Sequence, residues 1–382
     1  MVVPTFKPKR KSSIFIYVLA FVGVGLLVYF GGSFLGKAGG LIGGKSGLVV
    51  EAQNSDAEVS LDDNYLGKTP FESKDIKSGE HKVTVKNASS SYDVQLTFAR
   101  GSQVAMVRDL GVSNAFSSGQ NLWLEKSSST AVLSVVSEPS GAKVLIDNTQ
   151  LGSTPFSTDT LSEGEYDLKI EAAGFEAQTS RIKIQKGHKL NVVVNLFPIP
   201  SPSRVELLAD STNLYDVNSA ESAVTSNSTD WAKAVVYWNK TRGLALGDTG
   251  INKEPVFDYF IDFNGRIYDK DGNDVTSSPD KLGSAARGAY LRRVSDGPGL
   301  TEAAKTVLTT VNSALGKRVQ VSGTPEGWLN VRATPSTTAE ILQRVNEGEI
   351  YVVLEEQTGW VKIKISDTVQ GWVSSSYTKA VE

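Results

Sequence analysis

The carboxylates of residues 254–274 are the side chains whose types and spacing come nearest to catalytic chemistry. Asp258 and Asp262 share one face of an expected strand at a separation of about 13 Å, wider than the carboxylate pair that cleaves glycosidic bonds. We therefore interpret both as residues of a half-exposed strand face. The segment DKDGND (269–274) lacks the spacing and the distal Glu of a calcium loop, and we interpret it as a turn.

Histidine and cysteine are scarce. The chain has two histidines, His81 and His188, and no cysteine. Ser–His–Asp catalysis and imidazole-bound zinc both need histidine. Residues 189–382 contain none, so neither is expected there. Disulfides and thiolate chemistry are excluded. The net charge of -3 argues against a nucleic-acid partner, which needs a basic face, and no cofactor is expected.

Residues 12–36 carry no charge, and their apolar centre is long enough to cross a bilayer as a helix. Positive flanks stay in the cytoplasm, and the segment is preceded by Lys7, Lys9, Arg10 and Lys11. A cleaved signal peptide is the alternative, but no A-x-A-like site follows closely. We predict a single-pass membrane protein in contact with the lipid bilayer, with a cytoplasmic tail (1–11), a transmembrane anchor (12–36), a Gly-rich linker (37–47) and extracytoplasmic domains after it.

An internal repeat follows, in which residues 57–85 align without gaps with residues 142–170. The matched pairs are Ala57/Ala142, Val59/Val144, Asp62/Asp147, Gly67/Gly152, Pro70/Pro155, Phe71/Phe156 and Gly79/Gly164. Alternating apolar stretches predict strands, with Gly, Pro and Asp/Asn in the turns. We interpret Asp62-Asp63 and Asp147-Asn148 as hairpin turns rather than metal ligands, and we expect positive φ at the matched glycines.

The repeat resembles the PEGA family, small β-sandwich domains of bacterial and archaeal envelope proteins. The second copy keeps the namesake pattern as EPSGA (138–142), whereas the first has NSDA (54–57). The resemblance implies two β-sandwiches, at residues 48–126 and 130–197, stacked one after the other as spacers. It implies a fold and no reaction.

Residues 318–382 alternate short strands with Gly, Asp and Pro turns. The motifs LNVRATPS (329–336), GWVKI (359–363) and GWVSSSY (371–377) resemble a bacterial Src-homology-three (SH3) type domain, a small β-barrel. Such domains often bind peptidoglycan peptides, and the candidate ligand-binding residues are Trp328, Asn330, Arg332, Trp360, Trp372 and Tyr377. A small barrel also needs an aromatic core, so part of this set is expected to be structural.

A Pro-rich linker (198–204) leads into a middle domain of mixed composition (205–317). The apolar run AKAVVYW (232–238) predicts a buried strand, and residues 256–272 predict a hairpin that turns at FNG. Residues 301–318 predict a helix capped by Thr301. The middle domain is therefore expected to be α+β or α/β.

The order of these pieces resembles the zinc amidases of the peptidoglycan-recognition type (N-acetylmuramoyl-L-alanine amidases), through the hairpin FDYFIDFNGRIYDK and the following helix. That family binds zinc through a His pair and a hairpin His. Here Tyr237-Trp238 and Asp258 stand at those positions. The resemblance therefore implies a pseudoenzyme without metal or catalytic residues, whose candidate groove contains Tyr237, Trp238 and Asp258.

The fold class expected from the whole chain is multidomain and mainly β, with one transmembrane helix, two β-sandwiches, one α/β or α+β domain and one small β-barrel. The expected function is non-catalytic binding of peptidoglycan by an envelope scaffold that tethers membrane to cell wall. Two alternatives stay open. One is a cell-wall hydrolase acting through Glu254, Asp258 and Asp262, and the other is an assembly or sensor subunit with envelope protein partners.

Overall fold

The computed structural model describes residues 45–127, 130–209, 211, 213–282, 285, 287–366 and 368–381. The predicted tail and anchor lie outside these residues, and β1 begins at Lys45, within the predicted linker range. Among the described residues, no helix combines the length and apolarity needed to span a membrane. The fold is mainly β, as predicted, and divides into two compact units: unit 1 comprises residues up to Leu110 with Ser117–Phe197, and unit 2 comprises Gly111–Phe116 with Pro198–Glu382.

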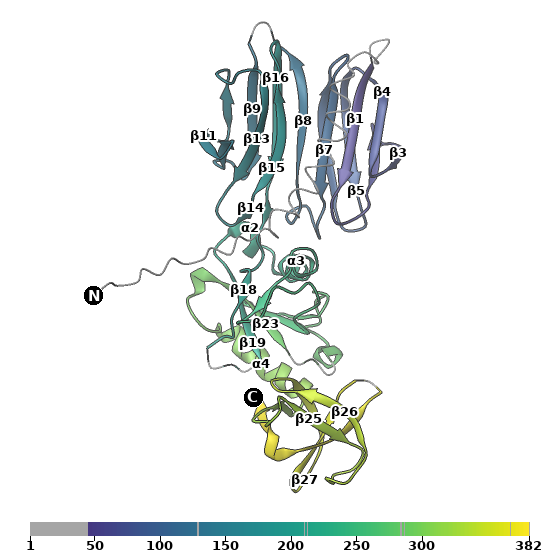
Figure 1. Ribbon diagram of the computed structural model, residues 1–382, viewed down its shortest axis with the longest axis vertical. Helices are drawn as coiled ribbons and strands as arrows, with labels where there is room; N and C mark the ends of the chain where they lie inside the picture. Colours follow the sequence, from purple (N-terminus) through teal and green to yellow (C-terminus); the bar gives the residue numbers. More distant parts are fainter. Residues whose placement is uncertain are drawn as a thin grey trace, which may run out of the picture. The chain divides into compact units, whose positions relative to one another are not determined.

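Unit 1 is built on a single seven-stranded sheet to which both repeats contribute (Figure 1). The strands, in sheet order, are β12 (Phe156–Thr158), β9 (Val132–Glu138), β16 (His188–Asn195), β8 (Ser118–Lys126), β7 (Gln103–Asp109), β1 (Lys45–Ala52) and β4 (Phe71–Lys77). The last strand of the first repeat, β8, pairs antiparallel with β7 on one side and with β16 of the second repeat on the other.

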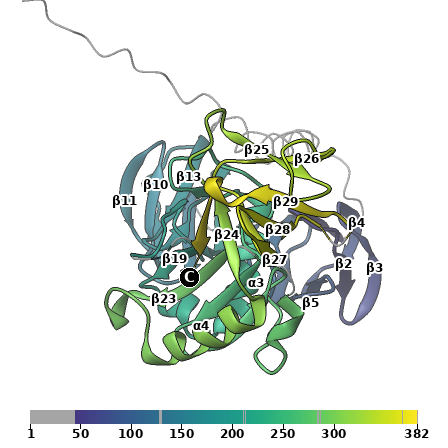
Figure 2. The same ribbon diagram turned by 90° about the horizontal axis from the view of Figure 1, so that it is seen from below.

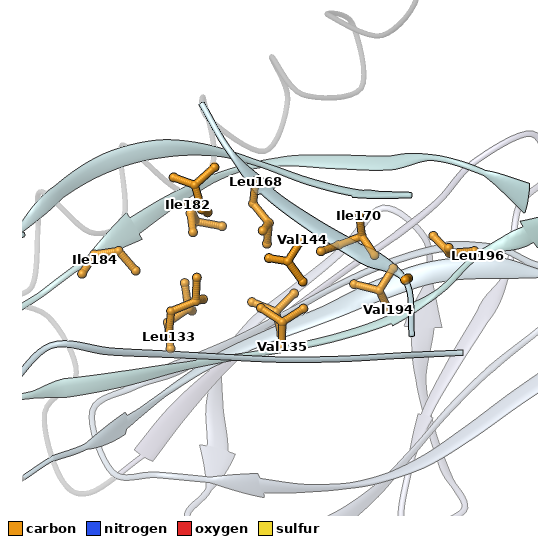
Figure 3. Packing of buried hydrophobic residues seen from close by; sticks show 13 residues of the cluster. Leu133, Val135, Val144, Leu168, Ile170, Ile182, Ile184, Val194 and Leu196 are labelled. Atoms are coloured by element: carbon orange, nitrogen blue, oxygen red, sulfur yellow. The ribbon is translucent and has the colours of Figure 1, made fainter. Parts of the chain in front are cut away.

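Each repeat adds a four-stranded sheet of its own. In the first repeat this sheet contains β3 (Asn64–Lys68), β2 (Glu58–Leu61), β5 (Gly79–Lys86) and β6 (Ser91–Phe98). In the second it contains β11 (Thr149–Ser153), β10 (Lys143–Ile146), β13 (Gly164–Glu171) and β15 (Gln178–Ile184), while β14 (Phe175–Glu176) pairs with β17 (Phe197–Pro198). Figure 3 shows the core between the second repeat's sheets, where Val144 and Ile170 face Val135 and Val194.

The predicted pair of separate, stacked sandwiches is therefore corrected to two sandwiches fused through one sheet. The physical reason lies in β8, whose side chains alternate between the two faces. Trp123 packs on the core of the first repeat, and its neighbours Leu122 and Leu124 pack on the core of the second. The two four-stranded sheets consequently cover opposite faces of the shared sheet.

The turn predictions for the repeats are confirmed, and the glycine prediction is partly wrong. Asp62 and Asp63 have φ of 48° and 63°, and Asp147 and Asn148 have φ of 48° and 64°, the positive pair that a type I′ hairpin requires. The glycines before the matched prolines do not have positive φ. A Cβ on Gly152 would lie 2.7 Å from the ring of Phe156, so a close ring contact explains this glycine.

The middle domain in unit 2 has a four-stranded mixed sheet. Its order is β19 (Leu214–Ser219), β23 (Gly288–Arg293), β21 (Tyr259–Asp262) and β22 (Ile267–Asp269). Strands β19, β23 and β21 are parallel, whereas β21 and β22 form the predicted antiparallel hairpin. The remaining elements are β18 (Arg204–Val205), which pairs with β20 (Ala245–Leu246), and the short helices α2 (Ser222–Thr225), η1 (Pro279–Leu282) and η2 (Val294–Asp296).

The predicted strand at residues 232–238 is wrong, because this segment belongs to helix α3 (Ser228–Thr241). The Asn227 side chain caps the helix by accepting a hydrogen bond from Asp230 N. Trp231, Val235 and Trp238 are buried at helical spacing, so the 3.6-residue period, rather than the short apolar run, decides the structure. The helix predicted at residues 301–318 is confirmed as α4 (Glu302–Leu315), with Thr301 as its cap.

The C-terminal module is a seven-stranded sheet in the order β26 (Ile341–Asn346), β25 (Trp328–Arg332), β29 (Gln370–Ser374), β28 (Trp360–Lys364), β27 (Ile350–Gln357), β24 (Arg318–Val321) and β30 (Thr378–Val381). A short helix, η3 (Ser375–Tyr377), connects β29 to β30. The sheet is open, not the predicted barrel, because the edge strands β26 and β30 do not pair with each other. Figure 2 shows β24 to β29 of this sheet. The sheet curves around a core that includes Val331, Val345 and Ile363.

Candidate functional site

The candidate site is the convex face of the C-terminal sheet, the side opposite its apolar core. On β25, Leu329 and Val331 point into the core, so Trp328, Asn330 and Arg332 point outward by strand alternation. We call this surface the outer face. It includes these three residues with Arg344, Trp360, Lys362 and Trp372.

The strand register brings the outward residues of three strands together. Arg332 on β25 lies opposite Trp372 on β29, which lies opposite Lys362 on β28. Trp360 is two residues along β28 on the same side. Residues directly opposite in a sheet share a face, so five of the six residues predicted from the sequence lie on the outer face. Within it, Trp372 is only 7% exposed, and the charged residues on either side flank its ring.

The accessible end of the outer face combines a ring with a cation. The Arg344 guanidinium carbon lies 3.8 Å from the ring centroid of half-buried Trp328, a cation–π contact at the surface. Arg344 also lies directly opposite Asn330. Sequence reasoning missed Arg344 and Lys362; their signal was the two-residue alternation of strands opposite the predicted site.

The polar side chains at the centre of the outer face differ in their hydrogen bonding. Arg332 Nη1 donates a 2.7 Å hydrogen bond to Ala339 O, which holds the guanidinium in place beside Trp372. Asn330 Oδ1 is buried and accepts no hydrogen bond from any residue that the structure describes. Ile341, opposite Arg332, is 47% exposed and adds an apolar border. A rigid cation, an amide acceptor and aromatic rings therefore lie side by side.

Tyr377 is the predicted residue that the structure does not bring to this face. It lies on η3 and packs against the core cluster of the module. Its ring therefore belongs to the aromatic core that so small a domain was expected to need.

Models of known families match two parts of the chain. The PEGA domain model matches residues 45–92 and 130–199, and the bacterial SH3 domain model matches residues 329–379. The chain carries PEGA and bacterial SH3 domains. No curated protein matches it. The outer face thus belongs to the SH3 domain, and the fused sandwiches are the PEGA copies, whereas the middle domain lies outside both matches.

The second predicted site, the groove of the middle domain, loses the strand on which it depended. Tyr237 and Trp238 lie on α3, and the Arg242 guanidinium carbon lies 5.8 Å and 5.1 Å from their ring centroids. Asp258 is exposed, and its Oδ2 accepts a 2.8 Å hydrogen bond from Arg287 N. In the described residues, no three His, Asp or Glu side chains are grouped so that they could hold a metal.

Asp262, one of the carboxylates considered for hydrolysis, has structural partners. Asp262 is fully buried, and its Oδ1 accepts hydrogen bonds from Asn264 N (2.9 Å) and Arg266 N (2.8 Å), which shape the hairpin turn. Its Oδ2 accepts a 2.8 Å bond from the Tyr268 hydroxyl, which also lies 3.1 Å from Ser228 Oγ at the start of α3. Burial raises the pKa of Tyr268 to about 12.

The DKDGND segment is a turn, as predicted. Asp269 Oδ1 accepts hydrogen bonds from Asp271 N (3.0 Å) and Asn273 N (2.9 Å), an Asx-type arrangement that uses the carboxylate locally.

Proposed function

We propose that the protein is an extracytoplasmic scaffold that tethers a membrane to the cell wall, by an anchor at residues 12–36 and by non-catalytic binding of peptidoglycan on the outer face of the SH3 domain. PEGA and bacterial SH3 domains are consistent with an extracellular binding or scaffold role. The observation that carries the finer proposal is the contact of Arg344 with Trp328 next to Asn330 and Arg332.

The chemistry of the outer face suits a polymer of sugars and short acidic peptides. An indole ring packs on the apolar face of a sugar, and its N–H stays available to a polar group. Guanidinium groups bind carboxylates with charge-assisted hydrogen bonds, and peptidoglycan stem peptides carry carboxylates. Arg332, held by Ala339 O, is positioned before any ligand arrives, which lowers the entropic cost of binding.

The non-catalytic part of the proposal rests on the residues that hydrolysis would need. Residues 189–382 contain no histidine, and Asp262 is occupied by the hairpin turn and Tyr268. We expect no soluble fragments when purified peptidoglycan is incubated with the full chain and analysed by chromatography. Release of muropeptides would favour the hydrolase alternative.

The binding claim is tested by co-sedimentation of the full chain, in detergent, with purified peptidoglycan sacculi. The double variant Trp328→Ala/Arg344→Ala removes both partners of the surface contact, and we expect roughly a tenfold or greater loss of affinity. Lys379→Ala, at an exposed lysine on the far edge strand β30, is the matched control and should bind like the unmodified chain. Equal sedimentation of the double variant and the control would exclude the outer face as the binding site.

A further inference from the structure

The two PEGA copies are joined by more than the chain between them, because one strand completes both. Strand β8 has backbone partners on both sides. Its Trp123 pairs with Val104 of β7, and its Leu124 pairs with Leu190 of β16. Its successive side chains enter different cores. Without β8, one edge of β16 would have no strand partner, and the second copy would lose Leu122 and Leu124 from the rim of its core.

Two adjacent polar residues of β8 repeat this division. Gln120 is 4% exposed, and its Nε2 donates a 3.4 Å hydrogen bond to Thr179 O on β15, in the small sheet of the second copy. Asn121 is fully buried, and its Nδ2 donates a 2.7 Å bond to the hydroxyl of Tyr92 on β6, in the small sheet of the first copy. The strand is therefore bound to four-stranded sheets on both of its faces.

Arg108 adds a side-chain link across the same strand. The register places Arg108 of β7 opposite Gly119 of β8, and Gly119 opposite Asn195 of β16. Because Gly119 has no side chain, the guanidinium passes over it, and Arg108 Nη1 donates a 3.2 Å bond to Asn195 Oδ1. A Cβ on Gly119 would lie 2.1 Å from Val107 O and 2.9 Å from Arg108 Cδ.

We propose that β8 is a donated strand that makes the two PEGA copies a single cooperative folding unit, so that neither copy opens without the other. This inference concerns stability and does not depend on the ligand of the SH3 domain. It predicts that a destabilising substitution in the core of one copy lowers the free energy of opening of both copies equally.

The repeat itself supplies a matched pair of variants. Val59 on β2 and Val144 on β10 occupy equivalent positions, are both fully buried, and lie in the two small sheets away from β8. Each Val→Ala variant removes two methyl groups from one core only, a loss that we expect to raise the exchange rate of core amides roughly tenfold or more. Gln150→Ala, at an exposed position on β11, is the surface control.

The measurement is hydrogen exchange of the full chain, followed by mass spectrometry. We expect Val59→Ala to raise the exchange of the slowest amides by the same factor in β5 and β6 as in β13 and β15, and Val144→Ala to do the same in both copies. Gln150→Ala should change neither. A rise confined to the mutated copy, in either variant, overturns the proposal and identifies the copies as independent domains.

Discussion

The two units of the chain join their modules in opposite ways. In unit 1 the PEGA copies share a backbone ladder, and Arg108 crosses the shared strand. In unit 2 the middle domain and the SH3 domain have separate sheets, and a buried side chain, Arg318 of β24, connects them. Arg318 Nη2 donates a 2.7 Å bond to Asn312 Oδ1 on α4. Both joints thus contain an arginine that is 1% exposed and is bonded to an asparagine of the neighbouring module.

The surroundings of the two arginines differ. The guanidinium carbon of Arg108 lies 3.5 Å from the Tyr92 ring centroid, and its Nη1 is bonded to Asn195. Burial lowers the pKa of Arg108 to about 10, an effect that Tyr92 and Asp109 oppose, so it stays charged at neutral pH. Arg318 Nε and Nη1 have no hydrogen-bond partner among the described residues, whereas in Arg108 this holds for Nε alone. Its charge, near the buried hydroxyl of Tyr259, opposes the rise in that group's pKa caused by burial.

This contrast teaches that a buried charge can be a necessary part of one joint and a replaceable part of another. In unit 1 the charge has the face of Tyr92 and the side-chain oxygen of Asn195 to compensate for its lost hydration, and the backbone ladder fixes its position. In unit 2 compensation is incomplete, so an apolar side chain of similar length should serve nearly as well.

The largest effect is expected at Gly119, where Gly119→Ala places a Cβ against the backbone oxygen of Val107 at a positive φ of 145°. We expect unit 1 to lose about 4 kcal/mol of stability, because strain and overpacking act together. Gly101→Ala is the matched control, since Gly101 has φ of 74° with nothing within 4 Å of a Cβ; it should cost about 1 kcal/mol. Urea unfolding of the two variants measures the difference, and equal losses would remove the argument for close packing at Gly119.

The next effect tests the arginines directly. Arg108→Met should destabilise unit 1 by about 3 kcal/mol, because it removes the cation from the Tyr92 ring and the hydrogen bond to Asn195 from a buried site. Arg318→Met should change unit 2 by less than about 1 kcal/mol, in either direction. Hydrogen exchange of the slowest amides in each unit gives both values. Similar losses in the two variants would show that the joints do not differ in the way described.

A smaller effect concerns pH and the side-chain contacts of unit 2. The pKa of Tyr268 is raised to about 12 from an ordinary 10, so the folded state holds a proton that the unfolded state releases between these values. The contribution of Tyr268 to the free energy of unfolding is about 2.5 kcal/mol. It is complete below pH 10 and is lost as the pH rises through 12. Urea unfolding from pH 9 to 12, followed by tryptophan fluorescence, should show this slope. The slope should be smaller in Tyr268→Phe, where the raised pKa values of Tyr259 and Tyr351 still contribute; an unchanged slope would assign it to those groups.

Local chemistry made part of the fold predictable. The Asp62-Asp63 and Asp147-Asn148 turns, the hairpin at residues 256–272 and the Thr301 cap each depend on a few neighbouring residues, and the structure confirms them. Five of the six candidate ligand-binding residues of the C-terminal module also lie on one face of its sheet. Arg344 was missed because it lies on a different strand, and pairing register cannot be read from one strand alone.

The errors arose where non-local packing decides. The run AVVYW in α3 fits a buried strand by composition, but Trp231, just before the predicted window (232–238), forms a helical period with Val235 and Trp238. The shared sheet had a signal in LWL (122–124), an unbroken apolar run rather than an alternating one, which indicates a strand covered on both faces. Which second sheet covers it depends on contacts far away in the sequence.

The direction of the strands in unit 1 has a geometric consequence. Because β8 is antiparallel to both β7 and β16, and β1 and β9 are parallel to those strands, β1, β7, β16 and β9 all run the same way. The copies are therefore related by a pseudo-twofold axis along β8. The chain enters at Lys45 and leaves at Asn195, roughly 25 Å farther along the strand direction. Duplication of the PEGA domain thus widens unit 1 across its strands, while its length along the strand direction remains that of a single copy.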